Sequence, residues 1–142
     1  MNCIKISKKY LRDNIDSFVE IEDFYFKEDA WSLKNFLISL PKKFNYSFVF
    51  EKEKEISGYC IASQKSDSYY IHRFVVAREF IGNGLAKNMM KIALELSKRN
   101  NKKFIKLSVH KENKRAISFY SKTDFSVVSS SGDHYIMKLK IL

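Results

Sequence analysis

The stretch Tyr69–Asn100 reads YYIHRFVVAREFIGNGLAKNMMKIALELSKRN, and the rest of the chain is organised around it. Its first eight residues, 69–76, are aromatic or β-branched at most positions, which favours a strand. Gly82 and Gly84 follow, two of only four glycines in the chain. From Leu85 onward, apolar residues recur every three or four positions, which predicts an amphipathic helix. This strand–glycine loop–helix order indicates an anion site, because the first turn of a helix has unpaired N–H groups and a positive dipole end.

The flanking patterns predict alternating strands and helices. We expect strands at 3–7, 44–50, 56–63, 69–76, 104–110, 125–129 and 134–141 and helices at 10–25, 30–40, from 85 to about 100, and 113–122. The short charged link 51–55 makes its flanking strands antiparallel, whereas the helix between 69–76 and 104–110 makes those two strands parallel. The predicted fold class is therefore mixed α/β (α+β), with a central mixed sheet of about seven strands flanked by four helices.

Length and composition indicate one domain over residues 1–142, because 142 residues can bury a sizeable core. No apolar run is long enough to span a membrane, and the N-terminus MNCIKISKK has no signal-peptide core, so we expect a cytoplasmic protein without a membrane partner. Cys3 and Cys60 are isolated, which argues against a metal site or a disulfide framework.

The net charge of +10 is unevenly distributed. Residues 13–29 carry seven acidic residues against one basic residue, a local charge of −6. The lysines are dispersed rather than gathered on one run, so we expect no nucleic-acid partner, although a basic nucleic-acid-binding domain stays a weaker alternative. The acidic stretch suggests a cationic ligand, and a solvated acidic helix face is the simpler explanation of the same residues.

With these elements in order, the chain resembles the GNAT superfamily of acetyl-CoA-dependent N-acetyltransferases. Gly84-Leu85-Ala86 matches the end of the family's pyrophosphate loop, although Ile81 stands where the family usually has Arg or Gln. Asn113, Ala116, Tyr120 and Phe125 match its N-x-x-A-x-x-x-Y-x-x-x-x-F pattern. The resemblance implies acetyl-CoA as co-substrate, without a metal, and transfer of its acetyl group to a primary amine of a small molecule or peptide by direct attack in a ternary complex.

The resemblance also assigns roles to individual residues. Tyr120 is the expected general acid, and the backbone of 74–76 is expected to polarise the thioester carbonyl. The expected cofactor-binding residues are Phe74, Val75, Val76, Ile81, Gly82, Asn83, Gly84, Leu85, Ala86, Lys87, Asn113 and Tyr120.

The general base is left open between His72, His110 and water. His72 is predicted to share a strand face with Phe74 and Val76, and an ordinary histidine titrates near neutrality. A packed strand histidine is an equal alternative, and His110 at a strand end is more readily structural. Ser108 replaces a glutamate found in relatives that acetylate protein N-termini, which argues against that substrate class.

Two other expectations come from the resemblance. The first two helices border the acceptor site, so the stretch from Val19 to Trp31 is expected to face the amine, which its acids would make a cationic one. A homodimer is allowed, because many relatives dimerise. The main alternative function is a GNAT-like acyl-CoA-binding protein without catalysis.

Overall fold

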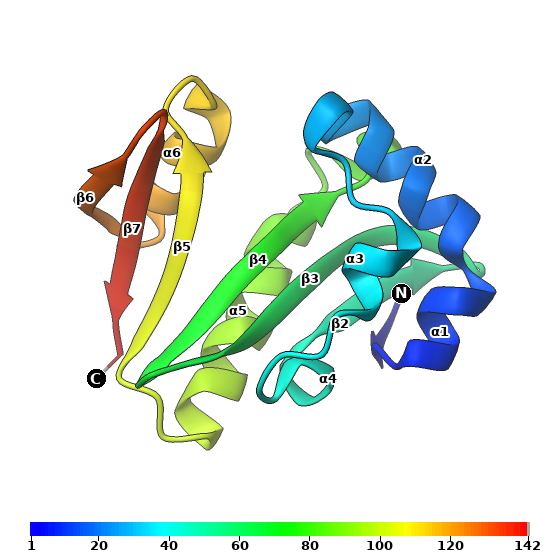
Figure 1. The fold of residues 1–142 in the computed structure, drawn as a ribbon, viewed down its shortest axis with the longest axis horizontal. Coiled ribbons are helices and arrows are strands. Elements are labelled where there is room, and N and C mark those ends of the chain that lie inside the picture. Colours follow the sequence, from blue (N-terminus) through cyan, green and yellow to red (C-terminus); the bar gives the residue numbers. More distant parts are fainter. Residues whose placement is uncertain (142) are drawn as a thin grey trace.

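A computed structural model of the chain, in which residues 1–141 are described, shows a single seven-stranded sheet in the order β1-β2-β3-β4-β5-β7-β6 (Figure 1). All neighbouring strands are antiparallel except β4 and β5, which are parallel. The predicted mixed sheet and its parallel central pair are therefore confirmed. The strands are β1 (Asn2–Lys5), β2 (Phe48–Lys52), β3 (Glu55–Lys65), β4 (Ser68–Val76), β5 (Phe104–His110), β6 (Ser126–Ser131) and β7 (His134–Lys140).

Six α-helices, rather than the predicted four, occur within residues 1–141. The predicted helix 10–25 is two helices that meet at Asn14, whose side chain donates to the Tyr10 carbonyl at the end of the first. The predicted helix 30–40 is shorter, because Ile38 is already extended. The helices are α1 (Lys8–Asp13), α2 (Ile15–Phe26), α3 (Leu33–Leu37), α4 (Lys43–Tyr46), α5 (Leu85–Arg99) and α6 (Lys114–Lys122), with short 3₁₀ helices η1 (Lys27–Asp29) and η2 (Arg78–Phe80).

The strand expected over 44–50 begins only at Phe48, since its first part forms α4. The Lys43 ammonium donates to the carbonyls of Phe36 (2.6 Å) and Ile38 (2.7 Å), so a buried lysine ties this turn to the end of α3. Alternating apolar residues therefore misled the prediction, because the side chain of Lys43 provides a local contact that periodicity does not encode.

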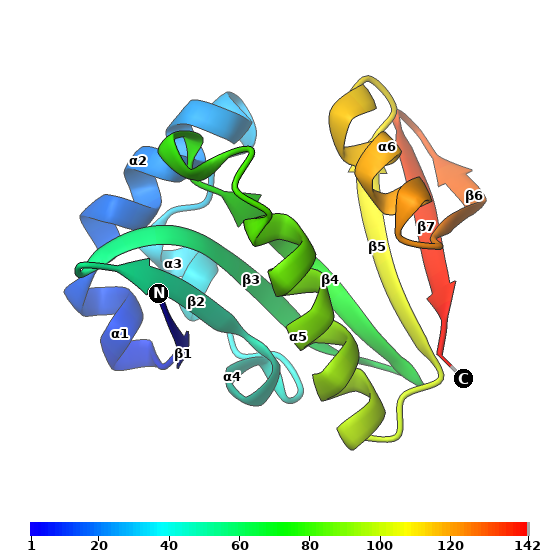
Figure 2. The ribbon, with the colours of Figure 1, turned by 180° about the vertical axis from the view of Figure 1, so that it is seen from behind.

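Helices cover both faces of the sheet. Helices α1, α2 and α3 lie on one face, and α5 and α6 lie on the other (Figures 1 and 2). The α5 side of the sheet contains the larger core cluster, into which Leu85, Met89 and Ala93 of α5 are buried, as the helical spacing predicts. The opposite cluster, here called the N-terminal core, contains Phe18 and Phe36. None of the described helices is long and apolar enough to cross a membrane.

Candidate active site

The pairing between the two central strands, β4 and β5, ends half-way along their length. Ser68 pairs with Phe104 and Ile71 with Leu107, and among the described residues the pairing stops there. Beyond this point β4 stays paired with β3 and β5 with β7, so the two halves of the sheet diverge in a V (Figure 1). The backbone of residues 74–76 therefore lies along an edge of β4 that no neighbouring strand covers.

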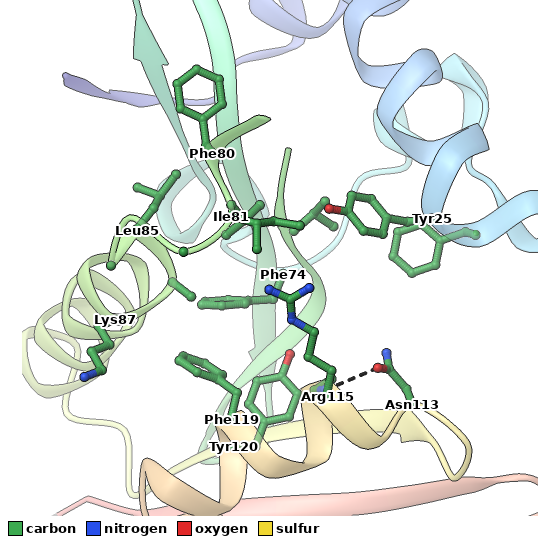
Figure 3. A pocket seen from close by; sticks show the side chains of 17 residues that line it. Tyr25, Phe74, Phe80, Ile81, Leu85, Lys87, Asn113, Arg115, Phe119 and Tyr120 are labelled. Atoms are coloured by element: carbon green, nitrogen blue, oxygen red, sulfur yellow. Dashed lines mark hydrogen bonds between the residues drawn. The ribbon is translucent and has the colours of Figure 1, made fainter. Parts of the chain in front are cut away.

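A cavity of about 610 Å³ lies at this opening. It is bounded by the glycine loop and first turn of α5, by α6, and by the end of α2 (Figure 3). Its lining residues are Tyr25, Phe26, Phe74, Val75, Val76, Phe80, Ile81, Gly82, Gly84, Leu85, Ala86, Lys87, Asn113, Arg115, Ala116, Phe119 and Tyr120. All of the cofactor-binding residues expected from the sequence are among them except Asn83.

The glycine loop supplies backbone donors to this cavity. Gly82 (φ +89°) and Gly84 (φ +77°) are both left-handed, a conformation that costs other residues free energy. Gly84 is the N-cap of α5, and no side chain caps the helix there. The unpaired N–H groups of the first turn, together with the positive end of the dipole, make this end of the cavity suited to a phosphate.

Tyr120 lies on the floor of the cavity, with its hydroxyl pointing inward (Figure 3). Its ring packs against Phe74 and Phe125, at centroid distances of 6.1 Å and 5.5 Å. Burial raises the pKa of the Tyr120 phenol well above its ordinary value. The phenol is therefore a proton-bearing hydrogen-bond donor at neutral pH, directed at the space between the diverging strands.

Polar groups of α6 and α5 complete the cavity. The Asn113 Oδ1 accepts from the Ala116 N–H (3.2 Å) and so caps α6, which leaves its amide NH₂ as a donor. Lys87 and Arg115 are the cations among the lining residues, and Arg115 reaches into the cavity (Figure 3). Ile81 contributes an apolar side chain where a polar contact would be usual in the resembled loop.

A β-bulge interrupts β4 at His72. Ile61 and Ala62 are adjacent on β3, but their partners on β4 are Arg73 and Ile71. One β4 residue, His72, is therefore inserted between two consecutive pairs. A bulge of this kind breaks the alternation of side chains along a strand.

Because of this bulge, Ile71 and Phe74 both contact the α5 side although they are three residues apart. The prediction that His72 shares a face with Phe74 and Val76 is wrong for this reason. The His72 Nε2 lies 2.7 Å from the Ser63 Oγ, and burial, with nearby cations, lowers the pKa of His72 to about 4. His72 is not among the residues that line the cavity.

His110 is also outside the cavity lining. Its Nε2 lies 3.1 Å from Asp133 in the turn between β6 and β7, and its Nδ1 accepts from the Glu112 N–H at 3.1 Å. Both ring nitrogens are therefore engaged at the end of β5. The structure brings neither candidate histidine to the space beside Tyr120.

The acidic stretch does not form a charged wall of the cavity. Glu22, one of the seven acids of this stretch, is fully buried. Its carboxylate accepts from Tyr59 and Arg73 rather than from solvent. Tyr25 and Phe26 are the residues of this stretch that line the cavity, so its contribution there is aromatic.

Sequence reasoning missed several of these residues. Arg115 stands two positions after Asn113, between two matched positions of the motif, and its charge there is the one signal that marks it. Tyr25, Phe26, Phe80 and Phe119 carry no comparable signal, because aromatic residues are spread throughout the chain.

Comparison with known proteins bears on this arrangement. A family model described as "Acetyltransferase (GNAT) family" matches residues 9–125. The chain belongs to the GNAT acetyltransferase family. The predicted resemblance and fold class are therefore confirmed.

This GNAT domain is similar to an uncharacterised N-acetyltransferase of Methanocaldococcus jannaschii, with 25% identity over 129 residues, covering 80% of this chain and 57% of that protein. Two solved structures share the fold. Ard1 from Thermoplasma volcanium has a TM-score of 0.85 and 23% identity, covering 99% of this chain and 97% of its own. The PaiA N-acetyltransferase from Thermoplasma acidophilum, in complex with coenzyme A, has a TM-score of 0.78 and 19% identity, covering 98% of both chains.

The family, and a relative that is named an N-acetyltransferase, support an acyltransferase activity. The PaiA N-acetyltransferase, which shares the fold, is in complex with coenzyme A. The cavity of this GNAT domain fits such a ligand, since it combines uncapped helix donors, two cations and an apolar lining. In residues 1–141, no group of three or more His, Cys, Asp or Glu side chains is placed to hold a metal ion.

Proposed function

We propose that this protein is an N-acetyltransferase that moves the acetyl group of acetyl-CoA to a primary amine by direct attack in a ternary complex. The observation that carries the proposal is one cavity joining the uncapped N-terminus of α5 to the Tyr120 hydroxyl, at the opening between β4 and β5. The bound co-substrate supplies an acetyl group already activated as a thioester.

The pyrophosphate would be held by the backbone N–H groups of the glycine loop and first turn, residues 82–87. These donors are preorganised, because the positive φ angles of Gly82 and Gly84 orient the loop before any ligand binds. Lys87 and Arg115 would add positive charge, and the amide of Asn113 would donate to the pantetheine arm or a phosphate.

The free edge of β4 would polarise the thioester carbonyl. Residues 74–76 line the cavity, and those of their backbone N–H groups that point away from β3 have no partner on β5. Fixed donors of this kind stabilise an oxyanion strongly in a site that excludes water. The proposed mechanism therefore keeps the role that the resemblance implies for residues 74–76, polarisation of the thioester carbonyl.

Tyr120 would stabilise the leaving sulfur by donating a hydrogen bond. An ordinary alkyl thiol has a pKa of about 8.5, below that of a buried phenol. The phenol therefore keeps its proton as the thiolate charge develops, so Tyr120 would act by hydrogen-bond donation rather than as the general acid that the resemblance implies, and the thiolate would leave to be protonated by solvent. Such a bond to a charged group contributes about 1.5–3 kcal/mol.

For the proton of the attacking amine, we propose water as the acceptor. His72 and His110, the two side-chain candidates, are engaged by Ser63 and Asp133 outside the cavity lining. The amine would enter from the α2 side, past Tyr25, and attack the carbonyl while the cofactor occupies the α5 side. The ternary complex is supported by the position of the cavity, which borders both α5 and the end of α2.

A GNAT-like acyl-CoA-binding protein without catalysis is the second candidate. The observation that favours it is that the described lining residues include no carboxylate or imidazole that could act as a base. The homodimer, the cytoplasmic location, and the absence of a nucleic-acid partner stay predictions.

Two measurements test the proposal. Isothermal titration calorimetry with coenzyme A and acetyl-CoA is expected to show saturable binding, and no heat with either ligand would contradict the proposed site. Free-thiol release from acetyl-CoA is then measured with propylamine, phenethylamine, spermidine and a peptide with a free α-amino group. Amine-dependent thiol release with an acetylated product supports the enzyme, and binding without release in every case supports the non-catalytic candidate.

A further inference from the structure

A buried ion pair joins α2 to the central strand. The Glu22 carboxylate is fully buried and accepts from the Tyr59 hydroxyl (2.5 Å) and the Trp31 N–H (2.8 Å). It also accepts from the Arg73 Nε, at 3.2 Å and 3.3 Å to its two oxygens. Every contact of Glu22 thus links α2 to a different segment of the chain.

Arg73 reaches both ends of the connection between α2 and α3. Its guanidinium lies 3.9 Å from the ring centroid of Phe26 and 4.5 Å from that of Trp31, and its Nη2 donates to the Asp29 carbonyl at 2.7 Å. Lys27, inside this connection, has a left-handed φ of +49°. A strained turn persists where surrounding contacts over-determine it, and the side chain of Arg73 supplies those contacts.

The ion pair of Arg73 and Glu22, here called the clamp, is connected to the cavity through residues that contact or adjoin Arg73. Phe26 touches the guanidinium and also lines the cavity, and Tyr25 lines it next in sequence. On the strand, Phe74 follows Arg73 and lines the same cavity. The Arg73 side chain therefore sets where Tyr25 and Phe26, at the end of α2, lie relative to the strand that would hold the thioester. These two residues are here called the aromatic wall.

The small net free energy expected of the buried Arg73–Glu22 ion pair favours a positioning role for Arg73 over a stabilising one. Desolvation makes a buried ion pair a weak source of net stability, and apolar replacements of similar volume are often neutral. The stacked guanidinium is nevertheless specific, because its Nε donates to Glu22 and its Nη2 to the Asp29 carbonyl, a geometry that lysine does not reproduce. The clamp thus contributes a defined geometry at a place where geometry matters for an acceptor.

The exposed aromatic rings at the end of α2 form a surface that suits an apolar group. Phe24 and Tyr25 are exposed and pack edge to face at 4.9 Å, and the Arg78 guanidinium lies 4.7 Å from the Phe24 ring. The charged side chains among the described lining residues are Lys87 and Arg115, both positive. Both cations are assigned above to the cofactor's phosphates, so at the end of α2 an acceptor meets ring faces, which suit an aromatic or apolar group.

We propose that Arg73 is a positioning residue that holds the aromatic wall of Tyr25 and Phe26 at the acceptor side of the cavity, and that this wall selects amines carrying an aromatic or apolar group. The inference rests on the proposed N-acetyltransferase function and names its acceptor class. It places Arg73 outside the reacting atoms, acting through Phe26 and Tyr25.

The test compares phenethylamine with propylamine, two simple primary amines that differ in the aromatic ring. The unmodified protein is expected to prefer phenethylamine by roughly tenfold in kcat/KM, the worth of one aromatic contact. Arg73→Met and Tyr25→Ala are each expected to bring that ratio to within about twofold by raising the KM for phenethylamine, while coenzyme A affinity measured by calorimetry stays unchanged. Arg12→Met, an arginine on the exposed face of α1, is the matched control and is expected to keep the ratio.

Trp31, the single tryptophan, reports directly on the clamp. Its fluorescence emission is expected to shift to the red in Arg73→Met and Arg73→Lys and to stay unchanged in Arg12→Met. Tyr25 is exposed, so Tyr25→Ala tests the wall even where an Arg73 variant fails to fold.

The outcomes separate the inference from the function on which it rests. An unmodified protein that binds no coenzyme A overturns the proposed function, and the inference with it. Coenzyme A binding and acetyl transfer without a preference for phenethylamine overturn the inference alone. A preference that survives both Tyr25→Ala and the folded Arg73 variants overturns it as well, as does a higher activity on spermidine than on phenethylamine.

Discussion

Gly84 offers a direct test of the glycine loop as a phosphate site. In Gly84→Ala, the new β-carbon would meet no atom within 4 Å, so crowding contributes nothing. The backbone is the source of the cost, because Gly84 has φ +77°. A left-handed conformation costs an L-residue roughly 1–2 kcal/mol, and alanine will either bear that strain or rotate the peptide that leads into α5.

The structure supplies a matched control in Gly132. It also has a positive φ, +58°, and open space around its β-carbon, but it lies in the turn between β6 and β7, away from the cavity. Gly84→Ala and Gly132→Ala should therefore lose similar stability, with Tm lower by roughly 4–8 °C in each. Rotation of the peptide before Leu85 would in addition remove one charge-assisted hydrogen bond to the phosphate, about 1.5–3 kcal/mol, or roughly a 10- to 150-fold weaker Kd.

The assay is calorimetric titration of coenzyme A into both variants and the unmodified protein, with Tm measured on the same samples. The expected pattern is equal loss of Tm and a weaker Kd only for Gly84→Ala. Equal affinity in all three proteins, or equal weakening by Gly84→Ala and Gly132→Ala, would refute the assignment of the loop to the phosphate.

Three further predictions concern Tyr120 on the floor of the cavity, His72 in the β-bulge, and Gly58, which packs against β4. Tyr120→Phe should lower kcat by roughly 10- to 100-fold with an unchanged coenzyme A Kd, since it removes one hydrogen bond to a developing charge; Tyr135→Phe is the control, and an unaltered kcat would exclude Tyr120 as the donor. Burial, with three nearby cations, lowers the pKa of His72 to about 4, so the unfolded chain binds the proton more readily, and stability should fall as pH drops from about 6.5 toward 4. His72→Gln should flatten that part of the Tm-versus-pH curve, and an identical curve would rule out His72 as its source. In Gly58→Ala the β-carbon would lie 2.9 Å from the Val75 carbonyl oxygen, so the free energy of unfolding measured in urea should fall by roughly 1–3 kcal/mol. An unchanged free energy would contradict the close approach of the Gly58 backbone to β4.

The glycine loop, α5 and the motif from Asn113 to Tyr120 could be predicted because their determinants are local. The helical spacing of Leu85, Met89 and Ala93 states which face is buried, and the structure agrees. The parallel pairing of β4 and β5 follows from a crossover helix of sufficient length. Residues separated along the chain but matched to one motif then meet in one cavity, because the loop and α6 both border the opening between these strands.

The irregularities escaped prediction because local spacing does not encode them. Alternation along β4 placed His72 beside Phe74, but an inserted residue against β3 shifts the register and moves it away from the cavity lining. The divergence of β4 from β5 depends on both strands having other partners, β3 and β7. Neither the bulge nor the divergence of the strands produces a recognisable pattern in the sequence of β4 or β5.

By itself, the sequence determined the family, the mixed sheet with its parallel centre, and the loop and helix that would hold a phosphate, since each rests on short-range periodicity or on a motif. Only the tertiary structure decided which side chains of α2 line the cavity and which are buried away from it. Glu22 is one of seven acids in a short stretch, and its partner Arg73, against which it is buried, lies 51 positions along the chain. Whether a charge faces solvent or a partner depends on what packs across from it, and that is a property of the folded chain rather than of any one segment.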